Sequence, residues 1–599
     1  MAEHRAADIN GEEDEEEALR IAIALSLGKD PNSTSIDLTQ DDEPAPPPAP
    51  ALAPQPVTTA APSSSLSALG LDRKKMEEER LARQNKRKAS ELGSGTVAEA
   101  ARPQQRQKTN DNAPRTLSTV VPSPAPMAAS LPFPQGVVKK TWVYGQPRLG
   151  DDIKIEEVLQ KDKLELAVLS SFQWDNEWLM SKIDFKRTKI TYVAFAANEA
   201  QREEMRSSVP PSRIRFCFPP MLAQGSMHSK LQLLKYANYL RIAIPTGNLV
   251  PYDWGETGVM ENMVFIIDLP RFENLEQQRE AQALKLTPFA EDLFYFLAAQ
   301  GLDDSLVSTL QKYDFSETKR YAFVHSMAGS HSGESWKRTG ESAFDRLRGM
   351  KLTVQHPGYC GLGRAVSALG LASEGDIELD YVCASLGAVN YDLLRGLYFA
   401  SQGDSGLKEY QLRTTTRKGK TVSGGYDDVE TLNKHIRVYF PSLQTVKESR
   451  GGKNNAGTIC FQSKWWAAES FPHQVLRDCQ STRKGVIMHS KVMFVRQSGS
   501  RTGQSKGFAY VGSANLSESA WGRLVKERGT GSPKITCRNW ECGVLVEALP
   551  QPDIDLGGNS SEIHDDLSSF AGRLRVPLPM KLPPQALGRD RTPWFYMDG

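Results

Sequence analysis

Met227-His228-Ser229-Lys230 occurs a second time in this chain, as Met488-His489-Ser490-Lys491. A single His-x-Lys carries little information, because a chain of 599 residues should contain on the order of one by chance. The two copies, however, have matching surroundings, since each is followed by a second apolar stretch and by a turn that ends in Asn-Leu, at 248–249 and at 515–516. In each half, this pattern therefore predicts a strand that carries His and Lys, a second apolar strand, and a turn that ends in Asn. Two unrelated strands with surface His and Lys side chains are the weaker interpretation.

The repeat also predicts a chemistry. Residues two apart on a strand point to the same face, so each copy would present an imidazole and an ammonium side by side. If the copies face each other, Lys230 and Lys491 supply positive charge, and Asn248 and Asn515 supply neutral donors, around one phosphate. One histidine, when neutral, can attack phosphorus and form a phosphohistidine, while the other donates a proton to the departing oxygen. We expect no metal and no cofactor, because neither copy is surrounded by the carboxylates of a two-metal nuclease.

The composition is that of a soluble intracellular protein of about two to four domains, with an apolar fraction of 39%. The longest apolar stretches are too short for a membrane span, and the acidic N-terminus does not resemble a secretory signal. The seven cysteines lack a paired CxxC spacing, which indicates reduced thiols. Residues 1–50 carry 13 acidic and three basic side chains, so a net charge of +1 for the whole chain leaves about +11 on the remainder. This basic remainder is compatible with a polyanionic substrate. We expect a monomer with no membrane association.

Residues 1–132 are dominated by Ala, Pro, Ser, Thr and charged side chains, which predicts a disordered tail. Three short segments of this tail resemble docking or targeting motifs: 14–29 a ubiquitin-interacting motif, 35–43 a SUMO-interacting motif, and 73–88 a bipartite nuclear localisation signal. They predict ubiquitin and SUMO as partners and the nucleus as the location. The alternative for 14–29 is an amphipathic helix without a specific partner, and for 35–43 it is a chance match. The alternative for 73–88 is a solvated helix with Glu-Lys pairs.

From about Pro134 the composition changes to alternating strand-like and helix-like segments. Lys189–Phe195 and Val264–Ile267 are typical of strands, and Phe289–Leu302 is typical of an amphipathic helix. Such alternation predicts the α/β class. With one His-x-Lys unit in each half, we expect two similar α/β domains related by a pseudo-two-fold axis, at 133–313 and 314–599.

The two His-x-Lys copies, with Gly512-Ser513-Ala514-Asn515 after the second, resemble the phospholipase D superfamily. That superfamily's usual Asp, about five residues after the Lys, is replaced here by Lys235 and Arg496. The missing Asp, together with Asn248 and the segment 539–544 (Asn-Trp-Glu-Cys-Gly-Val), resembles the tyrosyl-DNA phosphodiesterase 1 family in its fungal form. The resemblance covers about residues 134–599 and implies two phospholipase D-like domains.

The resemblance also implies a role for individual residues. His228 corresponds to the nucleophile and His489 to the general acid and base, with Lys230, Lys491, Asn248 and Asn515 as phosphate ligands. Glu541 corresponds to a carboxylate that orients His489. The family places a Gln in the equivalent position of the first half, and Glu261 lies nearest to it in the alignment. Ser385, in Ser385-Leu386-Gly387, resembles a segment that holds DNA phosphates.

The implied activity is the metal-independent hydrolysis of the phosphodiester between a DNA 3′ end and a tyrosine of a stalled type IB topoisomerase, a DNA repair reaction that leaves a 3′-phosphate. The implied partners are single- and double-stranded DNA with 3′-tyrosyl or other 3′ adducts, removed as by an exonuclease, and the topoisomerase I peptide. Trp465, Trp466 and Trp540 could stack on bases or pack in the core. The Lys- and Gly-rich insert at 414–455 could follow a DNA backbone, but a loop without a role is the favoured interpretation.

Two alternative functions stay open. The first is another phosphodiesterase of the phospholipase D superfamily, either a nuclease or a lipid-cleaving enzyme. The second is an inactive scaffold that binds ubiquitin- or SUMO-modified proteins through the tail. The absent Asp and the nuclear-type tail argue against the first, and the intact His-Lys pairs and Asn residues argue against the second.

Overall fold

The computed structural model describes residues 131–222, 225–283, 285–332, 357–416, 429–499, 505–549, 566–588 and 591–596. The tail motifs predicted at 14–29, 35–43 and 73–88 lie outside these residues. Residues 131–197 and the described residues from 211 onward belong to one compact unit. Residues 198–210 belong to a second unit and contain helix α5 (Glu199–Ser207), which begins where the side chain of Asn198 accepts a hydrogen bond from the backbone of Gln201.

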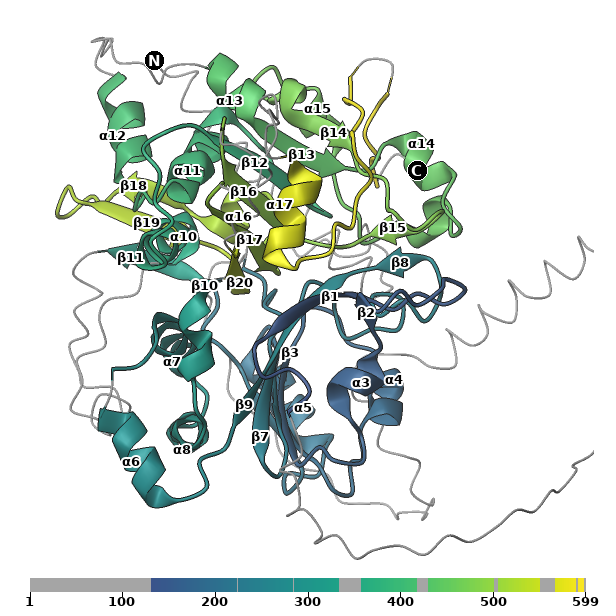
Figure 1. Ribbon diagram of the computed structural model, residues 1–599, viewed down its shortest axis with the longest axis vertical. Helices are drawn as coiled ribbons and strands as arrows, with labels where there is room; N and C mark the ends of the chain where they lie inside the picture. Colours follow the sequence, from purple (N-terminus) through teal and green to yellow (C-terminus); the bar gives the residue numbers. More distant parts are fainter. Residues whose placement is uncertain are drawn as a thin grey trace, which may run out of the picture. The chain divides into compact units, whose positions relative to one another are not determined.

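Two large sheets, one from each half of the chain, form the centre of the fold (Figure 1). The first has the order β2 (Asp152–Ile153), β1 (Val137–Thr141), β9 (Met263–Pro270), β7 (Tyr239–Pro245), β6 (Gln232–Lys235), β3 (Leu166–Ser170), β4 (Lys189–Val193) and β5 (Ile214–Cys217). The second has the order β10 (Tyr321–Ser326), β20 (Glu541–Glu547), β17 (Gly507–Gly512), β16 (Val492–Gln497), β12 (Ile377–Val382), β13 (Ile436–Phe440) and β14 (Leu476–Asp478).

The two sheets repeat one topology. In each, four antiparallel neighbours (β1, β9, β7 and β6; β10, β20, β17 and β16) are followed by an antiparallel step to β3 or β12 and then by two parallel strands. The parallel strands are β4 and β5 in the first sheet and β13 and β14 in the second. The chain is therefore built from two similar α/β halves, as the repeated motif predicts.

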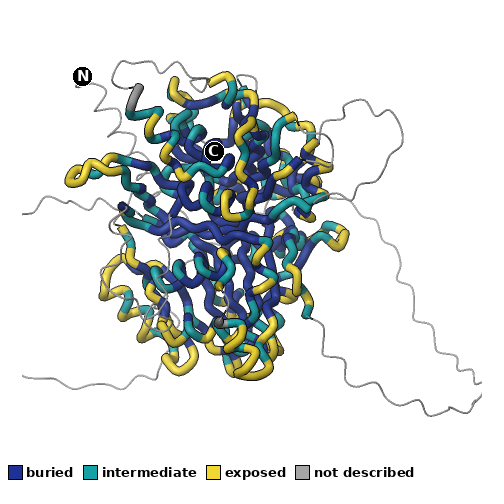
Figure 2. The backbone as a smooth tube through the Cα atoms, turned by 60° about the vertical axis from the view of Figure 1, so that its left-hand side comes forward, coloured by how far each residue is buried: buried dark blue, intermediate teal, exposed yellow. Residues whose placement is uncertain are grey.

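Alternation of side chains along the strands explains how the halves pack. On β7, Leu240, Ile242 and Ile244 enter one hydrophobic core, and Val492 and Phe494 of β16 enter the same core from the second half. The intervening residues of the second sheet, such as Met493 and Val495, enter a separate core. Strand β7 also contacts β17 and β20, and β9 contacts β17. The two sheets therefore share a core, and the strands run through the buried interior (Figure 2).

Helices cover these sheets and connect their strands. In the first half they are α3 (Ile155–Leu159), α4 (Asn176–Lys182), α6 (Leu275–Ala283), α7 (Pro288–Gln300) and α8 (Asp304–Thr309). In the second half they are α10 (Gly358–Ala368), α11 (Tyr391–Ser401), α12 (Leu407–Thr416), α13 (Val429–His435), α14 (Leu443–Lys447), α15 (Ser463–Trp466), α16 (Glu518–Trp521) and α17 (Leu567–Leu574). None of the helices in the described ranges is long and apolar enough to cross a membrane.

Helix α7 shows how local sequence sets an element. The Thr287 hydroxyl accepts a hydrogen bond from the backbone of Ala290, Pro288 occupies the first turn, and Gly301 ends the helix in a left-handed conformation with φ of 85°. Its apolar face, which includes Phe289 and Leu293, is buried in the shared core. The predicted helix at 289–302 is confirmed within two residues.

Other predictions have mixed outcomes. The strands expected at 189–195 and 264–267 correspond to β4 and β9, and all seven cysteines are free. The join predicted at 313 and 314 lies between β9 and β10, but both sheets fall within one compact unit, so the division into two domains stays a prediction. The prediction that 414–455 forms a loop is wrong, because the described part of this segment contains α13, β13 and α14. Strand β13 pairs with β12 and β14, and burial of Ile436, Val438 and Phe440 stabilises it there.

Candidate phosphate-binding active site

Both Met-His-Ser-Lys copies lie at the junction of the two halves. The sequence predicts them on strands, but β6 begins at Gln232 and β16 at Val492, just after each lysine. The reason is that each copy forms backbone hydrogen bonds with the opposite half. The His228 amide donates to the Trp540 carbonyl, and the His489 amide donates to the Glu261 carbonyl, each at 3.0 Å. A two-stranded sheet of β15 (Ile487–Met488) and β8 (Met260–Glu261) makes the second of these connections. The site therefore exists only when the halves are joined.

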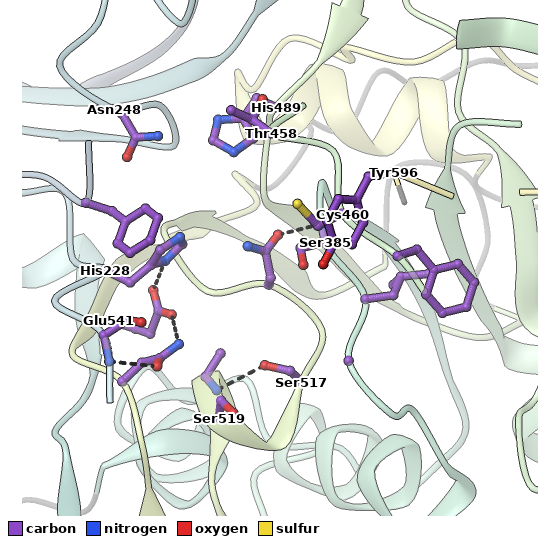
Figure 3. Close-up of a pocket in the computed structure, with 18 of the residues that line it drawn as sticks. His228, Asn248, Ser385, Thr458, Cys460, His489, Ser517, Ser519, Glu541 and Tyr596 are labelled. Atoms are coloured by element: carbon purple, nitrogen blue, oxygen red, sulfur yellow. Dashed lines mark hydrogen bonds and ion pairs between the residues drawn. The ribbon is translucent and has the colours of Figure 1, made fainter. Parts of the chain in front are cut away.

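A carboxylate from the opposite half holds each histidine. His228 Nδ1 lies 2.9 Å from Glu541 Oε2, and His489 Nδ1 lies 3.0 Å from Asp253 Oδ1. Because ionised carboxylates only accept hydrogen bonds, Nδ1 of each ring carries the proton and Nε2 is left for chemistry. Figure 3 shows both rings beside one space, with Asn248 at its edge. Both histidines can therefore act on the same bound group.

These pairings correct two predictions. Glu541 orients His228 and not His489, and the partner of His489 is Asp253. Glu261 contacts neither histidine side chain, because its carboxylate accepts hydrogen bonds from the Ser481 hydroxyl and, at 2.8 Å, from Arg483. The physical reason is the reciprocal arrangement of the halves, in which the carboxylate behind each histidine comes from the other half.

Several neighbours keep the two carboxylates ionised. Glu541 also accepts hydrogen bonds from the Ser513 hydroxyl and from the amide of Asn539, and Asp253 accepts from the Asn248 backbone at 2.6 Å. Burial alone would raise the pKa of each carboxyl, but the histidines and the hydrogen bonds hold both pKa values below their usual range. Each carboxylate can therefore fix the tautomer and the direction of its histidine.

The two lysines of the motifs are fully buried, with 0% of either residue exposed. Lys230 Nζ donates to the His228 carbonyl at 2.9 Å, and Lys491 Nζ donates to the carbonyls of His489 and Thr246. In the described part of the chain, neither ammonium forms an ion pair within 4 Å. Burial lowers the pKa of Lys230 to about 8, and burial together with the neighbouring Lys230 holds the pKa of Lys491 well below its ordinary value. Two buried cations without a carboxylate partner form a site for an anion.

The two asparagines complete the set in corresponding positions. Asn515 Oδ1 accepts hydrogen bonds from the backbone amides of Ala384 and Ser385, at 3.2 and 3.0 Å. Its NH₂ group is left to donate, and both Asn515 and Ser385 line the pocket. Asn248 lies opposite, with long contacts of 3.4 Å to Gln173. The structure therefore brings together the six residues of the His-Lys-Asn sets and Ser385, with Glu541 behind them.

Sequence reasoning missed three residues of the site. Asp253 holds His489 from behind, whereas Gln173 and Phe172 line the pocket, and the Phe172 ring lies 5.3 Å from the His228 ring. Asp253 follows Asn248 by five residues, so a polar side chain just after the predicted turn was the signal that could have found it. Phe172 and Gln173 follow β3 and carry no such signal.

The three tryptophans proposed for stacking have different positions. Trp540 is buried and donates to the Pro220 carbonyl, and Trp466 packs edge-on against His473. Trp465 lines the pocket. Thr458, Cys460 and Tyr596 line it as well (Figure 3). Stacking on a substrate therefore stays a prediction for Trp465 only.

The protonation of the histidines follows from their surroundings. Burial lowers the pKa of His228, although Glu541 acts in the opposite direction. Burial likewise lowers the pKa of His489 to about 4, against the attraction of Asp253. Both rings are therefore neutral near pH 7 before an anion binds. Negative charge between them would raise both pKa values and favour a proton on one ring.

The corrected assignments give a prediction with a matched control. Asp253→Ala is expected to lower kcat by about 10- to 100-fold, because His489 loses the group that fixes its ring. Asp253→Asn should recover much of that loss, because an amide oxygen still accepts from Nδ1. Glu261→Gln is expected to leave kcat unchanged and to lower the free energy of unfolding by about 3 kcal/mol, because it breaks the buried pair with Arg483. Steady-state kinetics and urea unfolding measure both effects, and a large kcat loss in Glu261→Gln would contradict the reassignment.

Two alike α/β halves each place a histidine, a lysine and an asparagine around one anion site, which is the arrangement that a phosphodiesterase requires. Among the residues described, no three or more His, Cys, Asp and Glu side chains are grouped as metal ligands are. The family model for tyrosyl-DNA phosphodiesterase matches residues 137–588. The chain belongs to the tyrosyl-DNA phosphodiesterase family.

Individual relatives are distant. A tyrosyl-DNA phosphodiesterase 1 of Arabidopsis thaliana is 23% identical over 497 residues, which cover 75% of this chain and 71% of the relative. A probable tyrosyl-DNA phosphodiesterase of Caenorhabditis elegans is 20% identical over 331 residues, and the match spans 54% of this chain and 62% of the relative's length. The crystal structure of yeast tyrosyl-DNA phosphodiesterase superposes with a TM-score of 0.51 at 17% identity, covering 77% of this chain and 99% of the yeast chain. The fold is the one seen in that structure.

Proposed function

We propose that this protein hydrolyses the phosphodiester between a DNA 3′-phosphate and a tyrosine of a stalled topoisomerase I, through a phosphohistidine at His228. The observation that carries the proposal is the pair of buried ammonium groups, Lys230 and Lys491, beside the two histidines and without an ion-pair partner within 4 Å in the described residues. A phosphodiester anion would supply the missing negative charge. It would also accept hydrogen bonds from Asn248 and Asn515.

The reaction would proceed in two displacements. In the first, the lone pair on His228 Nε2 attacks phosphorus, the bond to the tyrosine oxygen breaks, and His489 gives its Nε2 proton to the leaving phenolate. In the second, His489 takes a proton from water, whose oxygen attacks phosphorus and breaks the bond to His228. The products are tyrosine and a DNA 3′-phosphate. Negative charge that develops on the phosphoryl oxygens lies against the two lysines throughout.

The protonation states suit this order of events. The lowered pKa of His228 keeps its Nε2 unprotonated at neutral pH, as attack requires. His489 is neutral before substrate binds, and the phosphodiester's charge raises its pKa so that it can take up the proton it later donates. Glu541 and Asp253 stabilise the positive charge that each ring carries in turn.

The choice of DNA and tyrosine rests on the family and on the relatives' names. We also propose that Ser385 donates to a DNA phosphate, and its position beside Asn515 at the pocket supports this role. We extend the proposal to single- and double-stranded DNA with other 3′ adducts and to exonuclease-like removal of 3′ groups. We still predict nuclear location, ubiquitin and SUMO binding, a monomeric state and the fungal type. The segments that predict the location and the ubiquitin and SUMO binding lie outside the described part of the chain. No specific observation favours a lipid substrate or an inactive scaffold.

The test offers the purified protein a single-stranded oligonucleotide that ends in 3′-phosphotyrosine, in the presence of excess EDTA. We expect release of free tyrosine and an oligonucleotide with a 3′-phosphate, because the lysines and histidines supply the charge and the proton transfers. Chromatography of both products measures the reaction. A matched substrate ending in a 3′-hydroxyl is the control, and absence of tyrosine release under chelation would refute the proposal.

A further inference from the structure

A small sheet extends from the rim of the pocket. It has the order β11 (Gly329–Ser332), β19 (Pro533–Cys537) and β18 (Arg523–Lys526), and Figure 1 shows β18 and β19 as a hairpin beside α10 and α12. Strand β18 begins four residues after Ser519, and β19 ends two residues before Asn539. Both Ser519 and Asn539 line the pocket, so each strand of the hairpin starts at the catalytic site.

The base and the inner face of the hairpin are held firmly. The backbone amides of Arg538 and Asn539 donate to the Ser519 carbonyl at 3.2 and 3.0 Å. Leu524, Ile535 and Cys537 of the inner face are buried, and the Leu524 carbonyl accepts from Arg413 at 2.7 Å. The hairpin is therefore a rigid extension of the pocket wall.

The tip and the outer face are basic. Residues 523–538 contain five Lys and Arg residues and one acidic residue, Glu527. Lys526 and Arg528 are exposed, and Lys534 is half-buried on the outer face. Within the described ranges, none of these three forms an ion pair within 4 Å, whereas Arg523 is paired with Glu518 at 3.1 Å. Three cations without acidic partners therefore extend outward from the site.

We propose that this hairpin, residues 523–538, binds the sugar-phosphate backbone of the DNA substrate away from its 3′ end. The inference rests on the proposed function only in taking DNA as the substrate. Asn539 follows Lys534 by five positions, and extended chain rises about 3.3 Å per residue, so Lys534 lies roughly 17 Å along the hairpin from the pocket wall. At about 3.4 Å per nucleotide of a stacked strand, the cations meet phosphates roughly five or more nucleotides from the scissile one. Short substrates therefore do not reach them.

The test compares the intact protein with the triple variant Lys526→Gln/Arg528→Gln/Lys534→Gln. Fluorescence anisotropy measures the Kd of labelled single-stranded 4-mers and 20-mers with 3′-hydroxyl ends over a range of salt concentrations. For the 20-mer, we expect the slope of log affinity against log salt to become shallower by about 2, because three phosphate contacts are lost. For the 4-mer, binding should not change. The control Lys163→Gln/Lys186→Gln/Lys189→Gln changes the same charge before β3 and at the start of β4, and should leave both substrates unaffected.

Kinetics on the same lengths with 3′-phosphotyrosine separate the hairpin's role from that of the pocket. The triple variant should lower kcat/KM for the 20-mer and leave kcat for the 4-mer unchanged. An unchanged salt slope for the 20-mer, an equal loss on the 4-mer, or an equal loss in the control would overturn the proposal. If the intact protein binds the 20-mer with the expected slopes but releases no tyrosine, the proposed function fails and the hairpin's role stands.

Discussion

His228→Asn is expected to lose tyrosine release from a 3′-phosphotyrosyl oligonucleotide by about 10⁴-fold or more, because the residue that forms the covalent intermediate is gone. Asparagine is the informative replacement. Its amide can still donate to Glu541, 2.9 Å from His228 Nδ1, while nothing remains at the position of Nε2. The buried carboxylate therefore keeps a partner, and the fold should be retained. Single-turnover assays with excess enzyme measure the loss.

Two comparisons make this prediction specific. Thermal unfolding of His228→Asn should resemble that of the unmodified protein, whereas His228→Ala leaves Glu541 with only the Ser513 hydroxyl and the Asn539 amide and should be less stable. Both variants should be inactive to the same degree. If either retains more than about a hundredth of the original rate, His228 is not the nucleophile.

His489→Asn is expected to slow turnover by about 10²- to 10⁴-fold and to trap DNA on the protein, because the two displacements depend on this residue unequally. A tyrosine phenolate leaves with modest help, so the first step still proceeds. Water must be deprotonated for the second step, and Glu541 is held against His228 Nδ1, which leaves His489 as the base on the side of Nε2. The phosphohistidine therefore accumulates. The replacement amide keeps a donor for Asp253.

Labelled oligonucleotide that stays with the protein on a denaturing gel, and that acid releases, would report this intermediate. Peptide mass spectrometry should place the adduct on His228. The double variant His228→Asn/His489→Asn is the control and should give no adduct. Because a carboxylate stands behind each histidine, the geometry alone is nearly symmetric, and this experiment separates the two roles. An adduct on residue 489 in the His228→Asn variant would mean that nucleophile and acid are exchanged.

Much of the site was accessible from the sequence, for a local reason. A His-x-Lys followed by an apolar strand and a turn ending in Asn is a contiguous pattern, and the two strands that follow each copy are neighbours in one sheet. The six residues of the two sets therefore meet as predicted. The role of Asp253 was not predicted, because an acidic residue in a turn is common. Only its contact with His489, 236 residues away, shows what it does. The helices and the strand of 429–447 were not predicted, because a short strand after a polar run is hard to recognise before the neighbouring strands of the sheet are known.

The repeated tetrapeptide by itself determined that the protein has two alike halves and that one phosphate-sized site takes a histidine, a lysine and an asparagine from each. Only the tertiary structure decided which carboxylate supports which histidine. Glu541 lies 313 residues from His228, and the sequence pairs it with the nearer His489. The sequence also indicates Glu261 as the orienting residue of the first half, but in the structure that residue is Asp253. The physical reason is that each motif forms its backbone hydrogen bonds with the opposite half. Proximity along the chain therefore says little about which charges meet once the two sheets share a core.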